Sequence, residues 1–402
     1  MIFWALVAMM VDIGIARLGY GLLLPAMRSD LHGDYGSFGT VATVYFACYL
    51  AGSLAGPFVL RRDPSAGATS AWSHAAVAAT LAASAASTGI AALGVTRALL
   101  GLATGVGVVA VFSAAMERVA PERRGGVSGI VWSGLAIGLI VSAAPTPWLL
   151  GVPGGWRAGT LAAAAIAAVT AVGLAISMRA RPAAAGALAA VARGDVPRAE
   201  TTAPSGEQTE TPFELRDLLR PHRFMLLALA YGGGGAAYTA YATFVIAALR
   251  AAGTGTGAIA VVWTALGVTG VAGALAVGTL MAGALRRWAF ALCLGAGAAG
   301  CALGAVPGVA FAIAGALAVG LSFATLPAIA TALARMRASS ATGPAAFTAV
   351  TCVFGAGQIL GPYSGGVLAD RAGPLAVGWL GAAYYAAGAL FAIADGIAQR
   401  PR

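Results

Sequence analysis

The chain has 402 residues, of which 59% are hydrophobic and 9% are charged. Soluble domains carry about 25% charged residues, so this composition excludes an ordinary soluble globular protein and indicates a chain that is solvated largely by lipid. All 24 basic residues are Arg, and the net charge is +10. In a soluble protein this charge would suggest nucleic-acid binding, but here the Arg residues lie between apolar segments, where they set the orientation of a membrane protein. We therefore expect a lipid bilayer, and no nucleic acid, as a partner.

Twelve apolar segments follow one another along the chain, bounded by Gly, Pro and charged residues. Because a helix of about 20 apolar residues is long enough to cross a bilayer, we predict twelve transmembrane helices. The predicted helices occupy residues 2–27, 38–60, 70–91, 94–118, 126–150, 156–178, 223–249, 257–283, 288–305, 308–334, 342–368 and 374–397.

A long polar stretch, residues 179–222, separates the sixth and seventh helices. It is rich in Arg, Pro and Ala and cannot bury a core, so we predict a cytoplasmic linker without fixed structure. Its end differs, because Thr211-Pro212-Phe213-Glu214 has an N-cap Thr, Pro at the first helical position and Glu three residues after the cap. This pattern predicts a short helix on the inner membrane surface.

The two halves that flank the linker repeat some of their residues at similar positions. For example, Gly14 to Tyr20 matches Gly232 to Tyr238. Parallel repeats with a site near the midplane between them are a transporter architecture. The repeats predict an N-terminal six-helix bundle over residues 1–178 and a C-terminal six-helix bundle over residues 223–402.

The distribution of Arg residues predicts the topology. If the N-terminus is cytoplasmic, most Arg residues fall in cytoplasmic gaps or in the linker, and the opposite side keeps only Arg28, Arg157, Arg250 and Arg371. The positive-inside rule then favours an even number of helices with both termini in the cytoplasm. We expect a multi-pass protein of a bacterial cytoplasmic (inner) membrane.

Four segments resemble motifs of the major facilitator superfamily. They are Ala16-Arg17-Leu18-Gly19-Tyr20-Gly21-Leu22-Leu23-Leu24-Pro25-Ala26-Met27, similar to the first-helix signature of the YbfB/YjiJ-type branch; Arg97 to Gly105, similar to the fourth-helix Arg-xxx-Gly-xxx-Gly motif; Pro121 to Gly125 with Ser128-Gly129, similar to the next loop and helix start; and Gly355 to Pro362 continuing to Asp370-Arg371, similar to the eleventh helix. The resemblance covers essentially the whole chain. It implies an all-α membrane protein with the major facilitator fold, in which twelve transmembrane helices form two pseudo-symmetric six-helix bundles.

The loop after the second predicted helix departs from the family pattern. The family carries Gly-xxx-Asp-Arg-x-Gly-Arg-Arg there, but Leu60 stands at the position of the acid and Asp63 falls three residues late. The second copy, Gly283 to Arg287, also lacks the acid. We therefore do not expect the usual charge latch at the cytoplasmic face.

Three ionisable residues, Asp12, Arg17 and Arg97, lie within predicted membrane helices. Such groups cost several kcal/mol unless they face a partner or a wet cavity, so they usually mark a pathway. On an α-helix, Asp12 and Arg17 would lie about 140° apart and face different neighbours. Arg17 is the candidate for solute or proton handling and Asp12 is the candidate proton carrier, although a structural network would look the same. For Arg97 the resemblance implies a part in proton coupling, and the alternative is a bond to backbone carbonyls.

Further candidates are aromatic, polar or small residues at membrane depth. Those expected to line a substrate cavity are Tyr20, Tyr238, Tyr241 and Gln358. Those expected to serve gating or close helix packing are Gly101, Gly105, Gly138, Gly232, Gly235 and Pro362. His74 stands alone in its segment, and no His, Cys, Asp or Glu set has metal-ligand spacing, so we expect no metal or cofactor.

These features favour a secondary active transporter that moves a small organic molecule by alternating access. Proton-coupled efflux is slightly favoured by the aromatic residues available for a cavity. Proton-coupled uptake of an organic anion is an alternative suggested by Arg17 and Arg97, and a membrane scaffold or sensor that transports nothing is another. No nucleophile, base and metal set converges, so we expect neither an enzyme nor catalytic residues. The expected partners are a small-molecule substrate and protons, and we expect a monomer.

Overall fold

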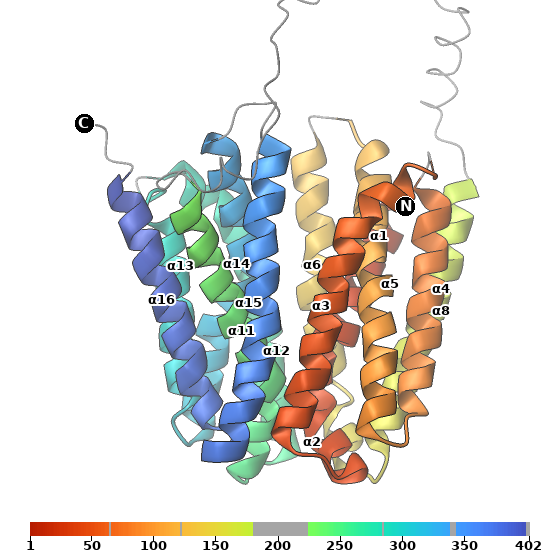
Figure 1. Ribbon diagram of the computed structural model, residues 1–402, viewed down its shortest axis with the longest axis vertical. Helices are drawn as coiled ribbons and strands as arrows, with labels where there is room; N and C mark the ends of the chain where they lie inside the picture. The colour runs from red at the N-terminus through yellow and green to blue at the C-terminus, as the bar shows by residue number, and fades with distance from the viewer. Residues whose placement is uncertain (64–65, 121–122, 180–223, 284, 338–342, 399–402) are drawn as a thin grey trace, which may run out of the picture.

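A computed structural model of the chain describes residues 1–63, 66–120, 123–179, 224–283, 285–337 and 343–398, and within these ranges the regular structure is entirely helical. Figure 1 shows the helices of residues 2–179 on one side and those of residues 225–398 on the other, and we call these the N-terminal and C-terminal halves. The N-terminal half contains α1 (Ile2–Met9), η1 (Met10–Leu18), α2 (Gly19–Leu31), α3 (Tyr35–Leu60), α4 (Gly67–Ala85), α5 (Ile90–Glu117), α6 (Arg124–Ala143), α7 (Thr146–Gly151) and α8 (Gly155–Arg179). The C-terminal half contains α11 (Met225–Ala251), α12 (Thr256–Ala282), α13 (Ala289–Gly304), α14 (Val309–Arg337), α15 (Gly343–Ala372) and α16 (Ala376–Ala398).

The described helices fit a protein that crosses a membrane several times. Eight of them are long and apolar enough to span a bilayer. Three of the others, α4, α11 and α15, are long helices with more small and polar residues, and α11 packs inside the molecule. In α11 almost every residue from Leu227 to Leu249 is buried. An element that is covered by protein on nearly all sides does not need a lipid-facing apolar surface.

Most predicted helices agree with the structure to within a few residues, with one clear difference. The predicted helix 126–150 is divided into α6 and α7, because Pro145 has no N–H to donate to the preceding turn and α6 ends just before it. The predicted linker, residues 179–222 with the short helix at Thr211 to Glu214, lies outside the described residues except for Arg179, the last residue of α8.

The first membrane segment is one continuous helix, Ile2–Leu31, whose middle part is π-helical and not α-helical. At its end the N–H of Gly19 donates to the carbonyl of Gly14, five residues earlier. A close helix crossing lies beside it, since a Cβ atom built on Gly14 would come within 2.6 Å of the Cα atom of Gly138 in α6. π-helical segments are rare and are frequent at functional sites.

Met1 and the end of α16 lie at one end of the molecule, which we call the termini end, and the opposite end is the far end (Figure 1). Asp370 of α15 joins the two halves at the far end, where its two carboxylate oxygens accept hydrogen bonds from the N–H groups of Tyr35 and Gly36, at 2.8 Å each. These are the first N–H groups of α3, which have no partner within the helix and carry the positive end of the helix dipole. Asp34 caps the same helix, and its hydrogen bonds with Ser37 hold the pKa of this carboxyl below its ordinary value.

Contacts between the halves continue from the far end to mid-depth. Along α3 and α15, Thr43 Oγ1 donates to the carbonyl of Ile359 at 3.2 Å, and Gly355 faces Leu50. On the other side of the molecule, Trp263 Nε1 of α12 donates to Ser142 Oγ of α6 at 3.0 Å. Closer to the termini end, α3 exposes Leu54 and Phe58. The halves are therefore closed against each other on the side of the far end.

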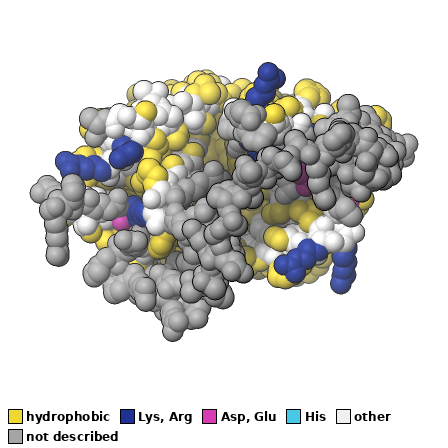
Figure 2. All heavy atoms as spheres, turned by 90° about the horizontal axis from the view of Figure 1, so that it is seen from above, with side chains coloured by type: hydrophobic (Ala, Val, Ile, Leu, Met, Phe, Trp, Pro, Cys, Tyr) yellow, Lys and Arg dark blue, Asp and Glu magenta, His cyan; other side chains and the backbone are white. Residues whose placement is uncertain are grey.

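The face at the termini end carries several Arg side chains around its rim, with apolar side chains between them where the surface is not covered (Figure 2). One acid near this end, Asp395, forms an ion pair. The guanidinium of Arg337 forms two hydrogen bonds with the carboxylate of Asp395, at 3.0 and 2.5 Å.

Candidate functional site

Arg17 lies between the two halves, near the middle of the first membrane segment. Its side chain is 7% exposed. The carbon atom at the centre of the guanidinium lies 4.6 Å from the ring centre of Phe46 and 4.7 Å from that of Tyr49, both on α3. One guanidinium nitrogen, Nη2, donates a hydrogen bond to the hydroxyl of Tyr238 on α11, in the other half. Cation–π contacts and this hydrogen bond offset part of the cost of burying the charge.

Two predicted residues of the C-terminal half meet Arg17 at this point. The side-chain amide of Gln358, on α15, donates to the same Tyr238 hydroxyl that accepts from Arg17. The Tyr238 ring is stacked between Phe323 and Phe354, with ring centres 5.9 Å apart in both pairs. The structure therefore brings together Arg17, Tyr238 and Gln358. We call these three, with the rings of Phe46, Tyr49, Phe323 and Phe354, the central cluster.

The charge of Arg17 is not neutralised by a carboxylate in the part of the chain that the structure describes. The ion pairs there join Asp12 to His74, Asp30 to Arg157 and Asp395 to Arg337. The Nε atom of Arg17 also has no hydrogen-bond partner among the described residues. A buried cation with spare donors favours an anion or another hydrogen-bond acceptor beside it.

The central cluster is tightly closed in this conformation. The void that adjoins Tyr238 measures about 10 Å³ and is lined by apolar side chains and Tyr241. A solute could bind here only by separating Arg17 from Tyr238, because these two side chains come from opposite halves. The same two groups would then both contact the solute.

Asp12 faces away from the central cluster, toward α4 in the N-terminal half. Its Oδ2 atom lies 3.2 Å from Nε2 of His74, and both side chains are buried. As expected, Asp12 and Arg17 have different neighbours, although the segment that carries them is π-helical. His74 stands alone in its own segment, but helix packing places it beside Asp12, although the two are far apart in the sequence.

Arg97 holds two elements of the N-terminal half together. Its Nη1 donates to the carbonyl of Ala16 at 2.9 Å, which is the backbone contact that the sequence left open for it. The guanidinium also lies over the rings of Tyr20 and Tyr45, at 4.5 and 4.9 Å. The Tyr20 hydroxyl donates to the carbonyl of Phe38 at 2.8 Å, so Tyr20 belongs to this packing rather than to the central cluster.

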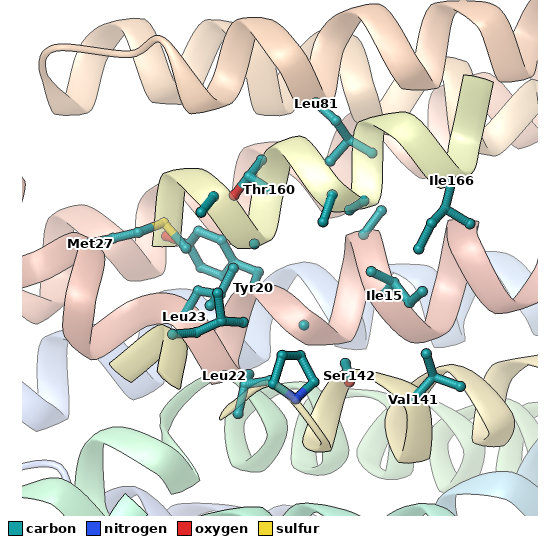
Figure 3. A pocket seen from close by; sticks show the side chains of 18 of the residues that line it. Ile15, Tyr20, Leu22, Leu23, Met27, Leu81, Val141, Ser142, Thr160 and Ile166 are labelled. Carbon is teal, nitrogen blue, oxygen red and sulfur yellow. The ribbon is translucent and has the colours of Figure 1, made fainter. Parts of the chain in front are cut away.

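A cavity of about 170 Å³ lies beside Arg97 and Tyr20, within the N-terminal half (Figure 3). Its lining is mainly apolar, with the hydroxyls of Ser142 and Thr160 as further polar groups. Figure 3 shows that Tyr20, Leu22 and Leu23 of α2 form one side of it. None of the three residues that meet at the Tyr238 hydroxyl lines this cavity.

The remaining sequence candidates lie at close helix contacts. Tyr241 faces Gly304 of α13, and its hydroxyl has no hydrogen-bond partner among the described residues. The small residues and Pro362 lie where backbones approach: Gly101 and Gly105 against α3, Gly138 against η1, Gly232 and Gly235 against α15, and Pro362 with its carbonyl against Gly39 of α3. Sequence reasoning missed Phe46 and Phe323, which carry no signal beyond being aromatic.

The fold and the central cluster together define a class, a multi-pass helical membrane protein with a buried cluster between its two halves. A search of solved structures supports this fold. A crystal structure of a mutant form of the nucleoside transporter NupG matches with a TM-score of 0.76, 15% identity and coverage of 98% of this chain and 99% of that one. A second crystal structure of NupG matches with a TM-score of 0.71 and 15% identity, covering 100% of this chain and 98% of that one. No curated protein matches the chain.

The family model described as "Uncharacterised MFS-type transporter YbfB" matches residues 9–398. The chain therefore belongs to this family of transporters, and it is not an enzyme. The resemblance stated from its motifs is confirmed.

Proposed function

We propose that this protein is a secondary active transporter that moves a small, planar organic anion between its two halves by alternating access. The observation that carries the proposal is the burial of Arg17 among aromatic rings without a carboxylate partner in the described residues. A guanidinium in such surroundings recognises a carboxylate, sulfonate or similar group through its planar donors. The rings of the central cluster offer flat apolar surfaces for the rest of the solute.

We infer the full architecture expected from the sequence. Twelve membrane helices form two six-helix bundles, and both termini and the linker are cytoplasmic. Because Arg side chains surround the rim of the termini end, the positive-inside rule supports this orientation. The described conformation is then closed to the outside, and a solute enters from the cytoplasm and separates Arg17 from Tyr238.

Proton-coupled efflux is the direction that we propose. The inside-negative membrane potential favours the exit of an anion by about 2.3 kcal/mol per charge for each 100 mV. Exchange for an entering proton adds to this driving force. The conformation closed at the far end also suits capture of a solute from the cytoplasm.

The test is a transport assay in proteoliposomes with a panel of aromatic sulfonates and their matched neutral sulfonamides. Sulfonates are permanently ionised, so passive diffusion of a neutral acid does not obscure the result. We expect saturable transport of at least one sulfonate and much weaker transport of its matched sulfonamide. When the opposite compartment is acidified, the sulfonate should move into that compartment against its own concentration gradient. Equal transport rates for a sulfonate and its sulfonamide would reject the anion site. Rates for both compounds no higher than in protein-free vesicles would also reject it.

Proton-coupled uptake of an organic anion is the second candidate, favoured by the same uncompensated Arg17. The assay separates the two directions of coupling. Accumulation on the side opposite to the acidified compartment indicates symport and therefore uptake, whereas accumulation on the acidified side indicates exchange and efflux.

A further inference from the structure

A buried acid and a buried imidazole lie side by side in the N-terminal half, away from the central cluster. Asp12 is 1% exposed and His74 is 0% exposed. Neither oxygen of Asp12 accepts an aligned hydrogen bond within the described residues, although Oδ2 lies 3.2 Å from Nε2 of His74. An ionised carboxylate in such a place is strongly disfavoured unless a positive charge or a proton accompanies it.

The other nitrogen of His74 determines how the ring can be protonated. Nδ1 lies 2.9 Å from the carbonyl oxygen of Ser70. A carbonyl can only accept a hydrogen bond, so Nδ1 must carry a proton. In the neutral ring Nε2 is then a lone pair that faces Asp12, and a lone pair against a carboxylate is repulsive. One proton between Nε2 and Oδ2 removes the repulsion, as imidazolium with carboxylate or as imidazole with carboxylic acid.

The neighbouring helices leave room for this pair and supply no other charge to it. A Cβ atom built on Gly107 of α5 would lie 3.4 Å from Oδ2 of Asp12 and 3.4 Å from Cε1 of His74, so the pair occupies the space in front of this glycine. On the described elements packed around η1, the other charged or titratable groups have partners elsewhere, stand near helix ends, belong to the central cluster or, for Cys48, pack against Gly101. They are Arg17, Tyr20, Arg28, Asp30, Tyr35, Tyr45, Cys48, Tyr49, Arg97, Glu117, Arg124, Arg157 and Arg179.

We propose that Asp12 and His74 form a closed site for one proton, and that this is the proton exchanged during transport. The second part rests on the proposed function. Asp12 belongs to the same π-helical segment as Arg17, Met10–Leu18. Converting a π-helical turn to an α-helical one shifts one part of a helix by about one residue, or 100°. Gain or loss of the proton can thus be linked to the direction in which Arg17 points.

Nitrogen-15 NMR of the full chain in lipid bilayers tests the site with protons as the only ligand. The chain has three His residues, and a His32→Asn, His222→Gln background leaves His74 alone. Asn suits position 32, because His32 is in the left-handed region with φ 52°. We expect Nδ1 to remain protonated, with either a charged ring or, with a neutral ring, an infrared band of a protonated carboxyl that Asp12→Asn removes.

The control variants make this result decisive. In Asp12→Asn the ring should be neutral and keep its proton on Nδ1, whereas Ser84→Ala, which removes a buried hydroxyl further along α4 that bonds Thr80 and Thr96, should leave the His74 signals in place. A neutral ring protonated on Nε2, a neutral ring beside an ionised Asp12, or a charged ring that persists in Asp12→Asn would overturn the site.

The transport cycle is tested separately with the aromatic sulfonate that the panel identifies. Asp12→Asn and His74→Gln should lower accumulation driven by a pH gradient at least tenfold, while exchange of labelled for unlabelled sulfonate continues. Accumulation by Asp12→Asn at the wild-type level would overturn the role of the pair in coupling. If the wild type does not respond to a pH gradient at all, proton coupling in the proposed function is wrong, and the NMR result alone decides whether the pair holds a proton.

Discussion

At the scale of single residues, the hydroxyl of Tyr238 is the atom at which the two halves meet, because it accepts from both Arg17 and Gln358. When a solute separates Arg17 from Tyr238, this hydroxyl can donate a hydrogen bond to the anionic group, and Tyr238→Phe removes that donor. A lost hydrogen bond to a charged group costs about 1.5–3 kcal/mol, so we expect the KM for the transported solute to rise at least tenfold. The measurement is the concentration dependence of the initial transport rate in proteoliposomes.

Tyr241→Phe is the matched control for this variant. It removes a hydroxyl from the same helix, but this hydroxyl has no hydrogen-bond partner among the described residues. KM should stay within about twofold of the wild-type value, because Tyr241→Phe removes no hydrogen bond, and a typical hydrogen bond contributes about 1 kcal/mol. A similar rise in KM for both variants would show that the effect does not come from a contact between the Tyr238 hydroxyl and the solute.

At this scale the sequence singled out candidate residues by their depth in the membrane. Arg17 and Asp12 stand out because an ionisable group inside an apolar helix is rare. Their partners could not be predicted in the same way. His74 and Phe46 are ordinary residues within their own helices, and only the packing of α4 and α3 against η1 brings them to Asp12 and Arg17.

At the scale of elements, the crossing of η1 and α6 depends on two glycines that face each other. A Cβ atom built on Gly138 would lie 2.5 Å from the carbonyl oxygen of Met10 and 2.7 Å from the Cα atom of Gly14. Both contacts are with backbone, which cannot move aside easily. We expect Gly138→Ala to destabilise the protein by about 1–3 kcal/mol, seen as a lower melting temperature of the purified protein.

Gly129 of the same helix is the control position, since a Cβ atom built there meets nothing within 4 Å. Replacing a helical glycine by alanine gains about 1 kcal/mol where space is available. Gly129→Ala should therefore melt at the wild-type temperature or higher. If both variants melt alike, the close crossing does not contribute to stability as described.

The positions of the helices followed from apolar length, but their internal irregularities did not. The π-helical segment η1 contains Gly14 but no Pro, and Gly14 lies in close contact with Gly138 of α6. This is a tertiary contact that no local pattern describes. The end of α6 was predictable in principle from Pro145, but its apolar neighbours on both sides suggested one continuous helix.

At the scale of the whole molecule, closure at the far end depends on Asp370 and the start of α3. Asp370→Asn replaces one acceptor oxygen by an NH₂ group, which would oppose an N–H of Tyr35 or Gly36. We expect the halves to separate more often at this end. A membrane-impermeant maleimide should then label a cysteine introduced at Thr43 several-fold faster, in a background without the four native cysteines.

Asp30→Asn is the matched control for this closure. It weakens a far-end ion pair with Arg157, 2.9 Å long, that lies within the N-terminal half. Labelling at position 43 should not change, because no contact between the halves is lost. Faster labelling in both variants would point to general loosening, and unchanged labelling in Asp370→Asn would mean that its carboxylate does not hold the halves together.

The central claim is that Arg17 binds the transported solute, and the most direct test is the initial rate of aromatic sulfonate transport by Arg17→Gln. Its melting temperature is measured on the same preparation, with Arg17→Lys and Arg28→Gln alongside. Lys keeps the charge of Arg17 but loses its planar donors. Arg28 belongs to the same helical segment, Ile2–Leu31, but its guanidinium lies over the ring of Tyr35 at the far end. We predict that Arg17→Gln transports at the level of protein-free vesicles and melts within a few degrees of the wild type, that Arg17→Lys retains part of the rate, and that Arg28→Gln transports normally. Normal transport by Arg17→Gln, or loss of folding in both Arg17 variants, would contradict the claim and leave Arg17 as a structural residue.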